Sequence, residues 1–209
     1  TFSDLKKFTF ETLNHCKYVI SNLIVARADW SITHVELMDS HPLFRQKIVL
    51  PLGDFTDMLG DVDLSEPDSS QTIKLNSGGL ARCELDYERN QSLRVKNILG
   101  FRLKTTDRLI VGRVQDLVLS LEDGKIVDFV IKAPYKGMGG KEYIFSPLLV
   151  KDVDTTKAIF NISVRRKFMD KCPTYDPISY DFIYRRGLAS HYDYMHERMS
   201  NVNRRLNNY

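Results

Sequence analysis

Two histidines and two carboxylates near the C-terminus are the residues best suited to bind a metal ion. His191, Asp193, His196 and Glu197 stand close together, and imidazole and carboxylate groups suit zinc or iron. If this stretch is helical, His191 and His196 lie about 140° apart around the helix axis. Both side chains cannot then reach one ion from one face, so the sequence predicts no metal site and no cofactor.

Other groups that could do chemistry have simpler structural explanations. His15 and Cys16 could form a nucleophile pair, but adjacent residues of a strand point to opposite faces. Asp61 with Asp63, and Asp152 with Asp154, could serve hydrolysis or bind calcium, yet their places beside strands favour the capping of turns.

The glycine-rich segment 133–140 is a further candidate, for nucleotide binding. It lacks the spacing of a phosphate-binding loop and introduces no helix, so it is expected to form a turn. No catalytic residue is predicted anywhere in the chain, and we do not expect an enzyme.

Basic residues of the second half could form a binding surface. Residues 1–90 carry a net charge of −5 and residues 91–209 a net charge of +8, which together make +3. With the aromatic residues of the tail, a basic patch could bind RNA. A solvated face, or a rim for an acidic protein surface, are the alternatives. The candidate patch consists of Lys151, Arg165, Arg166, Lys167 and Lys171.

Length and cysteine content restrict the class of protein. The 209 residues, of which 43% are hydrophobic, can build one large or two small cores. No apolar run approaches the roughly 18 residues of a membrane span. The cysteines Cys16, Cys83 and Cys172 are odd in number and widely spaced, which favours reduced thiols in the cytoplasm. No secretory signal is visible, and because the chain begins at Thr1, trimming of the natural N-terminus is expected.

The clearest structural element is a strand-turn-strand unit at residues 112–132. Asp123-Gly124 supplies the tight turn. In the second arm, Val127, Phe129 and Ile131 recur at every second position, which predicts a strand with one face in a core and Asp128 on the other face.

The same pattern recurs 94 positions earlier, at residues 18–38, where Ile32, Val35 and Leu37 align with Ile126, Phe129 and Ile131. A repeat of this length indicates a duplicated structural unit. We therefore predict a mostly β chain with a first domain at 1–76, a linker at 77–92, a second domain at 93–172 and an aromatic, basic extension at 173–209. Residues 53–70, rich in Asp, Gly and Ser, are expected to form turns around one short segment.

The second copy resembles a PRC-barrel, the module found in the cytoplasmic domain of the photosynthetic reaction centre H subunit and in a ribosome maturation factor. The resemblance covers residues 92–180 well and residues 2–76 more weakly, because Tyr18 and Asn22 replace the expected glycine and aspartate, Gly112 and Asp116. The matching segments are 99–100, 111–116, 126–131, 143–148, 164–169 and 173–178.

This resemblance implies two tandem small β-barrels with a partly helical or irregular C-terminal extension, as in tandem PRC-barrel proteins from bacteria. It also implies a non-catalytic adaptor that binds a protein partner or a second copy of itself; an RNA- or ribosome-associated accessory factor using the basic second half is the alternative. Large aromatic and methionine side chains dominate the centres of interfaces. The predicted contact residues are Trp30, Phe44, Tyr135, Met138, Tyr175, Tyr180 and Phe182.

Overall fold

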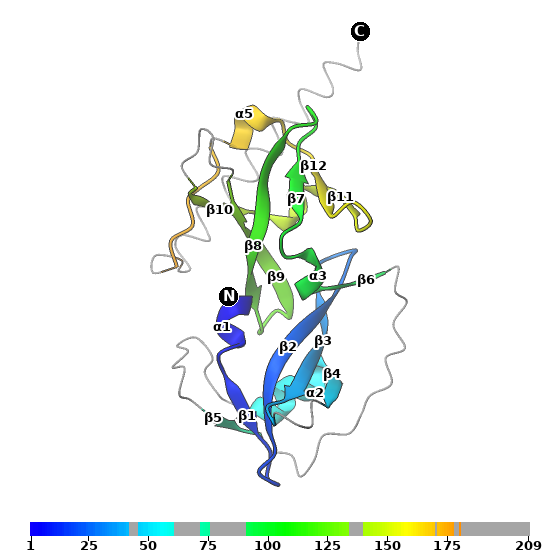
Figure 1. Ribbon diagram of the computed structural model, residues 1–209, viewed down its shortest axis with the longest axis vertical. Coiled ribbons are helices and arrows are strands. Elements are labelled where there is room, and N and C mark those ends of the chain that lie inside the picture. The colour runs from blue at the N-terminus through cyan, green and yellow to red at the C-terminus, as the bar shows by residue number, and fades with distance from the viewer. Residues whose placement is uncertain are drawn as a thin grey trace. The chain divides into compact units, whose positions relative to one another are not determined.

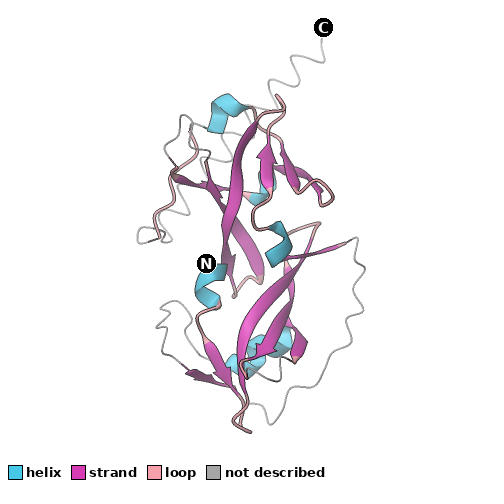
Figure 2. Cartoon of the chain, in the orientation of Figure 1, coloured by secondary structure: helices cyan, strands magenta, loops and turns pink. Residues whose placement is uncertain are grey.

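The computed structural model describes residues 1–41, 46–60, 72–75, 91–133, 140–169, 171–177 and 180 (Figure 1). The chain forms two compact units. The first unit comprises residues 1–100 and 116–128, and the second comprises residues 101–115 and 129–209. Strands dominate the described part of both units (Figure 2), which confirms the prediction of a mostly β chain.

The first sheet has the strand order β4-β3-β2-β1-β5, and a further strand, β6, pairs with β2. Its β1–β5 pair is parallel, whereas the other pairs are antiparallel. The strands are β1 (Thr9–Glu11), β2 (Lys17–Ala26), β3 (Ile32–Asp39), β4 (Lys47–Pro51), β5 (Thr72–Lys74) and β6 (Ser92–Arg94). The helices near them in sequence are α1 (Phe2–Leu5), α2 (Leu52–Leu59) and α3 (Val95–Ile98).

The second sheet has the order β10-β9-β8-β7-β12-β11, and its β7–β12 pair is parallel. The strands are β7 (Arg102–Lys104), β8 (Ile110–Ser120), β9 (Lys125–Lys132), β10 (Glu142–Phe145), β11 (Val150–Asp154) and β12 (Ile159–Ile162). A short 3-10 helix, η1 (Pro147–Leu149), and a short α-helix, α5 (Arg166–Met169), complete the described elements.

The two sheets repeat one topology. The order β4-β3-β2-β1-β5 corresponds to β10-β9-β8-β7-β12, with the last pair parallel in both. The turn before the long hairpin also repeats. His15 and Arg108 both adopt a left-handed conformation, with φ of 61° and 64°. The N–H groups of Thr12 and Thr105 each donate to the carbonyl four residues later, at 3.0 Å.

Within the described residues, neither sheet closes on itself, so the predicted barrels are not seen as closed structures. The first sheet ends at β4 and β5, and the second at β10 and β11. The tail adds a short extended segment to β10, because Ile144 N–H donates to Pro173 O at 3.0 Å and Tyr175 N–H donates to Glu142 O at 2.8 Å. This contact protects an edge that would otherwise expose backbone groups.

Aromatic side chains fill the core of each unit. In the first unit, the rings of Phe10 and Phe55 meet edge-to-face with centroids 5.4 Å apart. In the second, the Phe160 ring lies 5.6 Å from that of Phe101 and 5.3 Å from that of Phe129. Burial of such a side chain contributes about 1.5–3 kcal/mol relative to leaving it in water.

The turns of the two long hairpins bind each other inside the first unit. Ile32 N–H donates to Gly124 O at 2.7 Å, and Ile126 N–H donates to Trp30 O at 3.0 Å. Because these residues align 94 positions apart in the repeat, the two bonds are equivalent. The tip of the β8–β9 hairpin therefore completes the first unit.

A second reciprocal contact connects each hairpin to the short helix of the other repeat. Asn22 Oδ1 accepts from the next backbone N–H at 3.0 Å and from that of Lys96 in α3 at 3.0 Å. Asp116 Oδ1 accepts from the next backbone N–H at 2.8 Å and from that of Ser3 in α1 at 3.3 Å. Asn22 in the first copy thus makes the same kind of contacts as Asp116 in the second, because both side chains carry an Oδ1 atom that accepts hydrogen bonds.

One expectation about β9 is wrong. Val127 was expected to share the buried face with Phe129 and Ile131, with Asp128 on the exposed face. In the structure Val127 is half-buried and Asp128 is buried. Both faces of this strand are therefore covered in the middle, because Asp128, Phe129 and Val130 are all buried.

Candidate basic interface

The predicted basic residues are all exposed. Arg165, Arg166 and Lys167 follow β12 and lead into α5, and Lys171 stands just beyond that helix. Lys151 lies on β11, the neighbour of β12. The structure therefore gathers four of the five cations in one short segment, and places the fifth on the strand beside β12.

An aspartate in the β7–β8 turn holds this segment in place. Arg166 N–H donates to the carboxylate of Asp107, at 3.1 Å to Oδ1 and 3.4 Å to Oδ2. Next to it, Thr106 N–H donates to Val164 O at 3.0 Å. These bonds bring Arg108, which is exposed, to the same end of the unit as α5.

We call this surface the basic end; it consists of Arg108, Arg165, Arg166, Lys167 and Lys171. Arg108 was not predicted as a member from the sequence. The sequence signal that could have found it is the neighbouring Asp107. An aspartate carboxylate can accept a hydrogen bond from a backbone N–H at the start of a helix, and so can connect this turn to α5.

Asp107 is held in its ionised form. The hydrogen bond with the Thr105 side chain lowers the pKa of Asp107 most, and loss of some hydration of the exposed carboxylate opposes it. The Arg166 N–H and the charge of Arg165 lower the pKa further, so that it lies below its ordinary value. The carboxylate therefore positions the backbone beneath the cations while compensating only one of their charges.

The charge is concentrated in the second unit. Its described residues include twelve Lys and Arg against five Asp and Glu, a net charge of +7, whereas those of the first unit include nine against eleven, a net charge of −2. Among the described cations of the second unit, only Lys157 forms an ion pair, with Asp154 at 3.3 Å. The other cations are available to an external anion.

Three of the seven predicted contact residues are described by the structure. Trp30 is buried in the β2–β3 turn. Tyr175 and Tyr180 are half-buried, and their rings meet edge-to-face with centroids 6.0 Å apart. Phe44, Tyr135, Met138 and Phe182 lie outside the described residues.

The candidate catalytic groups have separate partners where the structure describes them. The His15 ring bonds Glu11 Oε1 at 2.8 Å, whereas the Cys16 thiol is directed to the Asn14 carbonyl at 3.9 Å. Asp154 accepts from the Lys157 N–H at 2.9 Å, which is the turn-capping role expected from its position.

The other candidates for chemistry are only partly described. Asp152 accepts from Asn161 Nδ2 at 3.3 Å. Asp61, Asp63 and Cys83 lie outside the described residues, as does the histidine cluster at 191–197. In the part of the chain that is described, no group of three His, Cys, Asp or Glu side chains is arranged to hold a metal ion. That part also contains no helix of the length and apolarity required to cross a membrane.

Comparisons with known proteins give little further information. No known family model matches the sequence, and no curated protein matches it. Among solved structures, one similar chain is RimM from Pseudomonas aeruginosa, described as a 16S ribosomal RNA processing protein. The two chains are 11% identical, the match covers 72% of this chain and 99% of that chain, and the TM-score is 0.29. A similarity at this level supports no conclusion about the fold or the function of this chain.

Proposed function

We propose that this protein is a non-catalytic accessory factor of the bacterial cytoplasm that binds RNA through the basic end of its second unit. In this proposal, the two sheets belong to the PRC-barrel family. The observation that carries the proposal is the exposed cluster formed by Arg108, Arg165, Arg166, Lys167 and Lys171 on a unit with a net charge of +7 over its described residues.

The physical reason is the competition between cations and counterions at phosphate groups. Each Lys or Arg that neutralises a phosphate releases a condensed counterion, which favours binding at low salt. A surface with few ion pairs of its own does not have to break internal contacts before it binds. Asp107 supports this arrangement, because its carboxylate is bonded to the backbone at Arg166.

The proposal is tested by charge reversal at the basic end. The variant Arg165→Glu, Lys167→Glu, Lys171→Glu is compared with Lys17→Glu, Lys74→Glu, Lys96→Glu, which changes the net charge equally at exposed lysines of the first unit. RNA binding is measured by fluorescence polarisation over a series of salt concentrations. The loss of three phosphate contacts should reduce the magnitude of the slope of log Kobs against log salt by about 2–3 for the first variant.

The control variant should retain most of the wild-type slope, because its substitutions lie in the other unit. Equal losses in both variants would mean that only net charge matters, and would remove the basic end as the site. Failure of the wild-type protein to bind RNA at low salt would remove the function itself.

A protein-interaction adaptor is the second candidate function. Exposed apolar side chains favour it, since Leu148 is 79% and Leu13 is 63% exposed. Tyr175 and Tyr180 offer a paired aromatic surface of the kind that anchors interfaces. If Tyr175→Ala combined with Tyr180→Ala leaves both the capture of protein partners and the oligomeric mass unchanged, these tyrosines are not the contact surface.

A further inference from the structure

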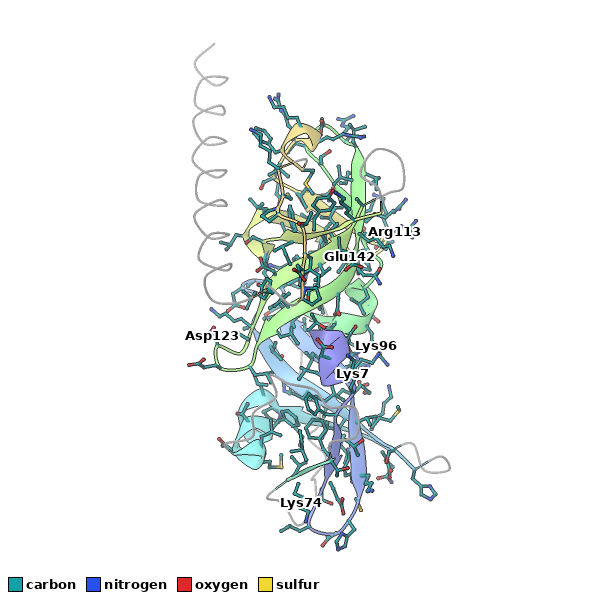
Figure 3. All side chains as sticks on the ribbon, turned by 90° about the vertical axis from the view of Figure 1, so that its left-hand side faces the viewer. Lys7, Lys74, Lys96, Arg113, Asp123 and Glu142 are labelled. Carbon is teal, nitrogen blue, oxygen red and sulfur yellow. The ribbon has the colours of Figure 1, made fainter. Side chains whose placement is uncertain are left out.

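Three cations share the outer face of β7 and β8. Arg102 lies directly opposite Arg113 in the antiparallel pair, and Lys104 stands two residues further along β7. Residues directly opposite each other have Cβ atoms about 4.5–5.5 Å apart. Leu103, between the two β7 cations, is fully buried, which places Arg102 and Lys104 on the same outer face. Arg113 is exposed at the surface of the second unit (Figure 3).

This arrangement costs stability in the free protein. Like charges that face each other across a strand pair repel. Arg102 donates from Nη2 to Lys157 O at 3.2 Å, which is a neutral acceptor, and neither Arg102 nor Arg113 forms an ion pair with a described residue. An anion bound over Arg102 and Arg113 would remove the repulsion between them. Anion binding is therefore more favourable here than at a surface where no like charges face each other.

The three cations continue into the basic end. β7 ends at Lys104, and the turn that follows carries Arg108. The Asp107 carboxylate then connects this turn to the backbone of Arg166. We call the combined surface the basic track; it consists of Arg102, Lys104 and Arg113 together with the basic end. Asn161, opposite Lys104 on β12, adds a neutral polar side chain to its border.

The aromatic rings of this part of the sheet point the other way. Phe101 is 6% exposed, and Phe129 and Phe160 are fully buried. No aromatic side chain of the described strands β7, β8 and β12 is exposed. Proteins that bind single-stranded RNA stack its bases on exposed aromatic rings. The base pairs of a duplex are already stacked, and its outer surface presents phosphates, which require only cations and polar donors.

We propose that the RNA bound by this protein is double-stranded, and that the basic track contacts its phosphate backbone without reading its sequence. The inference rests on the proposed function and specifies the form of its ligand. Arg102 and Arg113 bind the backbone as a pair, while Lys104 and the basic end extend the contact along the duplex.

The experiment compares wild-type protein with the variant Arg102→Gln, Lys104→Gln, Arg113→Gln. The matched control is Lys17→Gln, Lys74→Gln, Lys96→Gln, which removes three exposed lysines of the first unit. Figure 3 labels two of them, Lys74 and Lys96. Four probes are used: an RNA duplex of about 16 base pairs, the length that duplex-binding domains span, a single strand of equal length, a DNA duplex of equal length, and vesicles containing phosphatidylserine.

Wild-type protein should bind the RNA duplex at least about tenfold more tightly than the single strand. The track variant should lose this preference, and its salt slope for the duplex should fall in magnitude by about 3, one unit for each lost phosphate contact. Its melting temperature should stay unchanged or rise, because the repulsion between Arg102 and Arg113 is removed. A purely structural role of these residues would lower the melting temperature instead.

Three results would overturn the inference: equal or tighter binding of the single strand, tighter binding of the DNA duplex or the vesicles, or a track variant that behaves like the control. If RNA binding depends on the basic end while the track variant changes nothing, the proposed function stands and the inference fails. If wild-type protein binds no RNA at low salt, both fail together.

Discussion

Glu36 is a buried carboxylate in the first unit, only 2% exposed. Its Oε1 accepts from Ser21 Oγ at 2.6 Å and from Lys47 Nζ at 3.1 Å, and its Oε2 lies 2.9 Å from an Arg94 guanidinium nitrogen. Burial raises the pKa of Glu36, but the Ser21 and Lys47 hydrogen bonds and the charges of Arg94 and Lys47 outweigh it and hold the pKa below 4.5. The charged form is therefore the one that the fold stabilises.

The pH dependence of stability should reveal this carboxylate. Because its pKa is lower in the folded than in the unfolded state, its contribution is present above about pH 4.5 and is lost as the pH falls through the folded value. Glu36→Gln should cost about 1–3 kcal/mol near neutral pH, since Lys47 and Arg94 lose the negative charge with which they pair. Urea unfolding of both proteins at decreasing pH should show this difference shrinking.

An exposed glutamate provides the control for Glu36. Glu122, in the β8–β9 turn, is exposed, so Glu122→Gln should leave the free energy of unfolding within about 0.5 kcal/mol of the wild-type value. A Glu36→Gln difference that stays constant from neutral to acidic pH would show that the charge of this residue does not stabilise the fold.

At the scale of elements, the two hairpins and the two short helices α1 and α3 bind each other reciprocally. The Asn22 side chain accepts a hydrogen bond from the Lys96 N–H, and the Asp116 side chain accepts one from the Ser3 N–H. The two acceptors differ in environment, because Asn22 is 3% exposed whereas Asp116 is half-buried. An unsatisfied N–H costs more in the buried site, since water cannot replace the lost partner.

Substitution of these two acceptors should therefore have unequal effects. Asn22→Ala should lower the free energy of unfolding by about 1–3 kcal/mol, because it leaves the buried Leu23 N–H and the part-buried Lys96 N–H without their acceptor. Asp116→Ala should cost less, about 0.5–2 kcal/mol, as for other helix caps. Chemical denaturation measures both.

Asp116→Asn is the matched control, because it keeps the accepting oxygen and should be nearly neutral. If Asp116→Asn destabilises the protein as much as Asp116→Ala, then the charge matters and the shared oxygen does not explain why asparagine replaces aspartate in the first copy.

At the scale of the whole molecule, β8 and β9 each contribute residues to both units. Gly112 lies on the part of β8 in the second unit, where an added Cβ would be 2.5 Å from Ile131 Cγ2 and 2.9 Å from Lys132 O. A side chain there would force β8 and β9 apart. Trp30, the single tryptophan of the chain, is buried in the first unit, so its fluorescence reports on the unit that Gly112 does not belong to.

Gly112→Ala should destabilise the protein by about 1–3 kcal/mol through overpacking. Because the same strands serve both units, the Trp30 fluorescence transition should shift together with the circular dichroism transition. Gly53→Ala is the control: no atom lies within 4 Å of its added Cβ, and the change favours helix α2 by up to about 1 kcal/mol. An unshifted fluorescence transition in Gly112→Ala would show that the two units unfold independently.

The sequence predicted local structure where the pattern itself is local. The β8–β9 hairpin was located by its alternating residues and by Gly124, which adopts φ of 59° in the turn. Helix α2 was missed, because Gly53 and two aspartates, Asp54 and Asp57, suggested turns. Its buried residues Phe55 and Leu59 are four apart, a helical spacing that two residues alone cannot establish.

From the sequence alone one can obtain the strands of the two long hairpins, the tight turn at Gly124 and the duplication, because each depends on residues close together or on a repeat that can be aligned. Tertiary structure decided which charges gather: the bond between Asp107 and Arg166 joins positions 59 residues apart and brings Arg108 into the basic end. It also decided that β6 pairs with β2 and that the β8–β9 tip completes the first unit. Such contacts form only when the packing of the whole chain brings distant segments together. No local pattern of residue types contains that information.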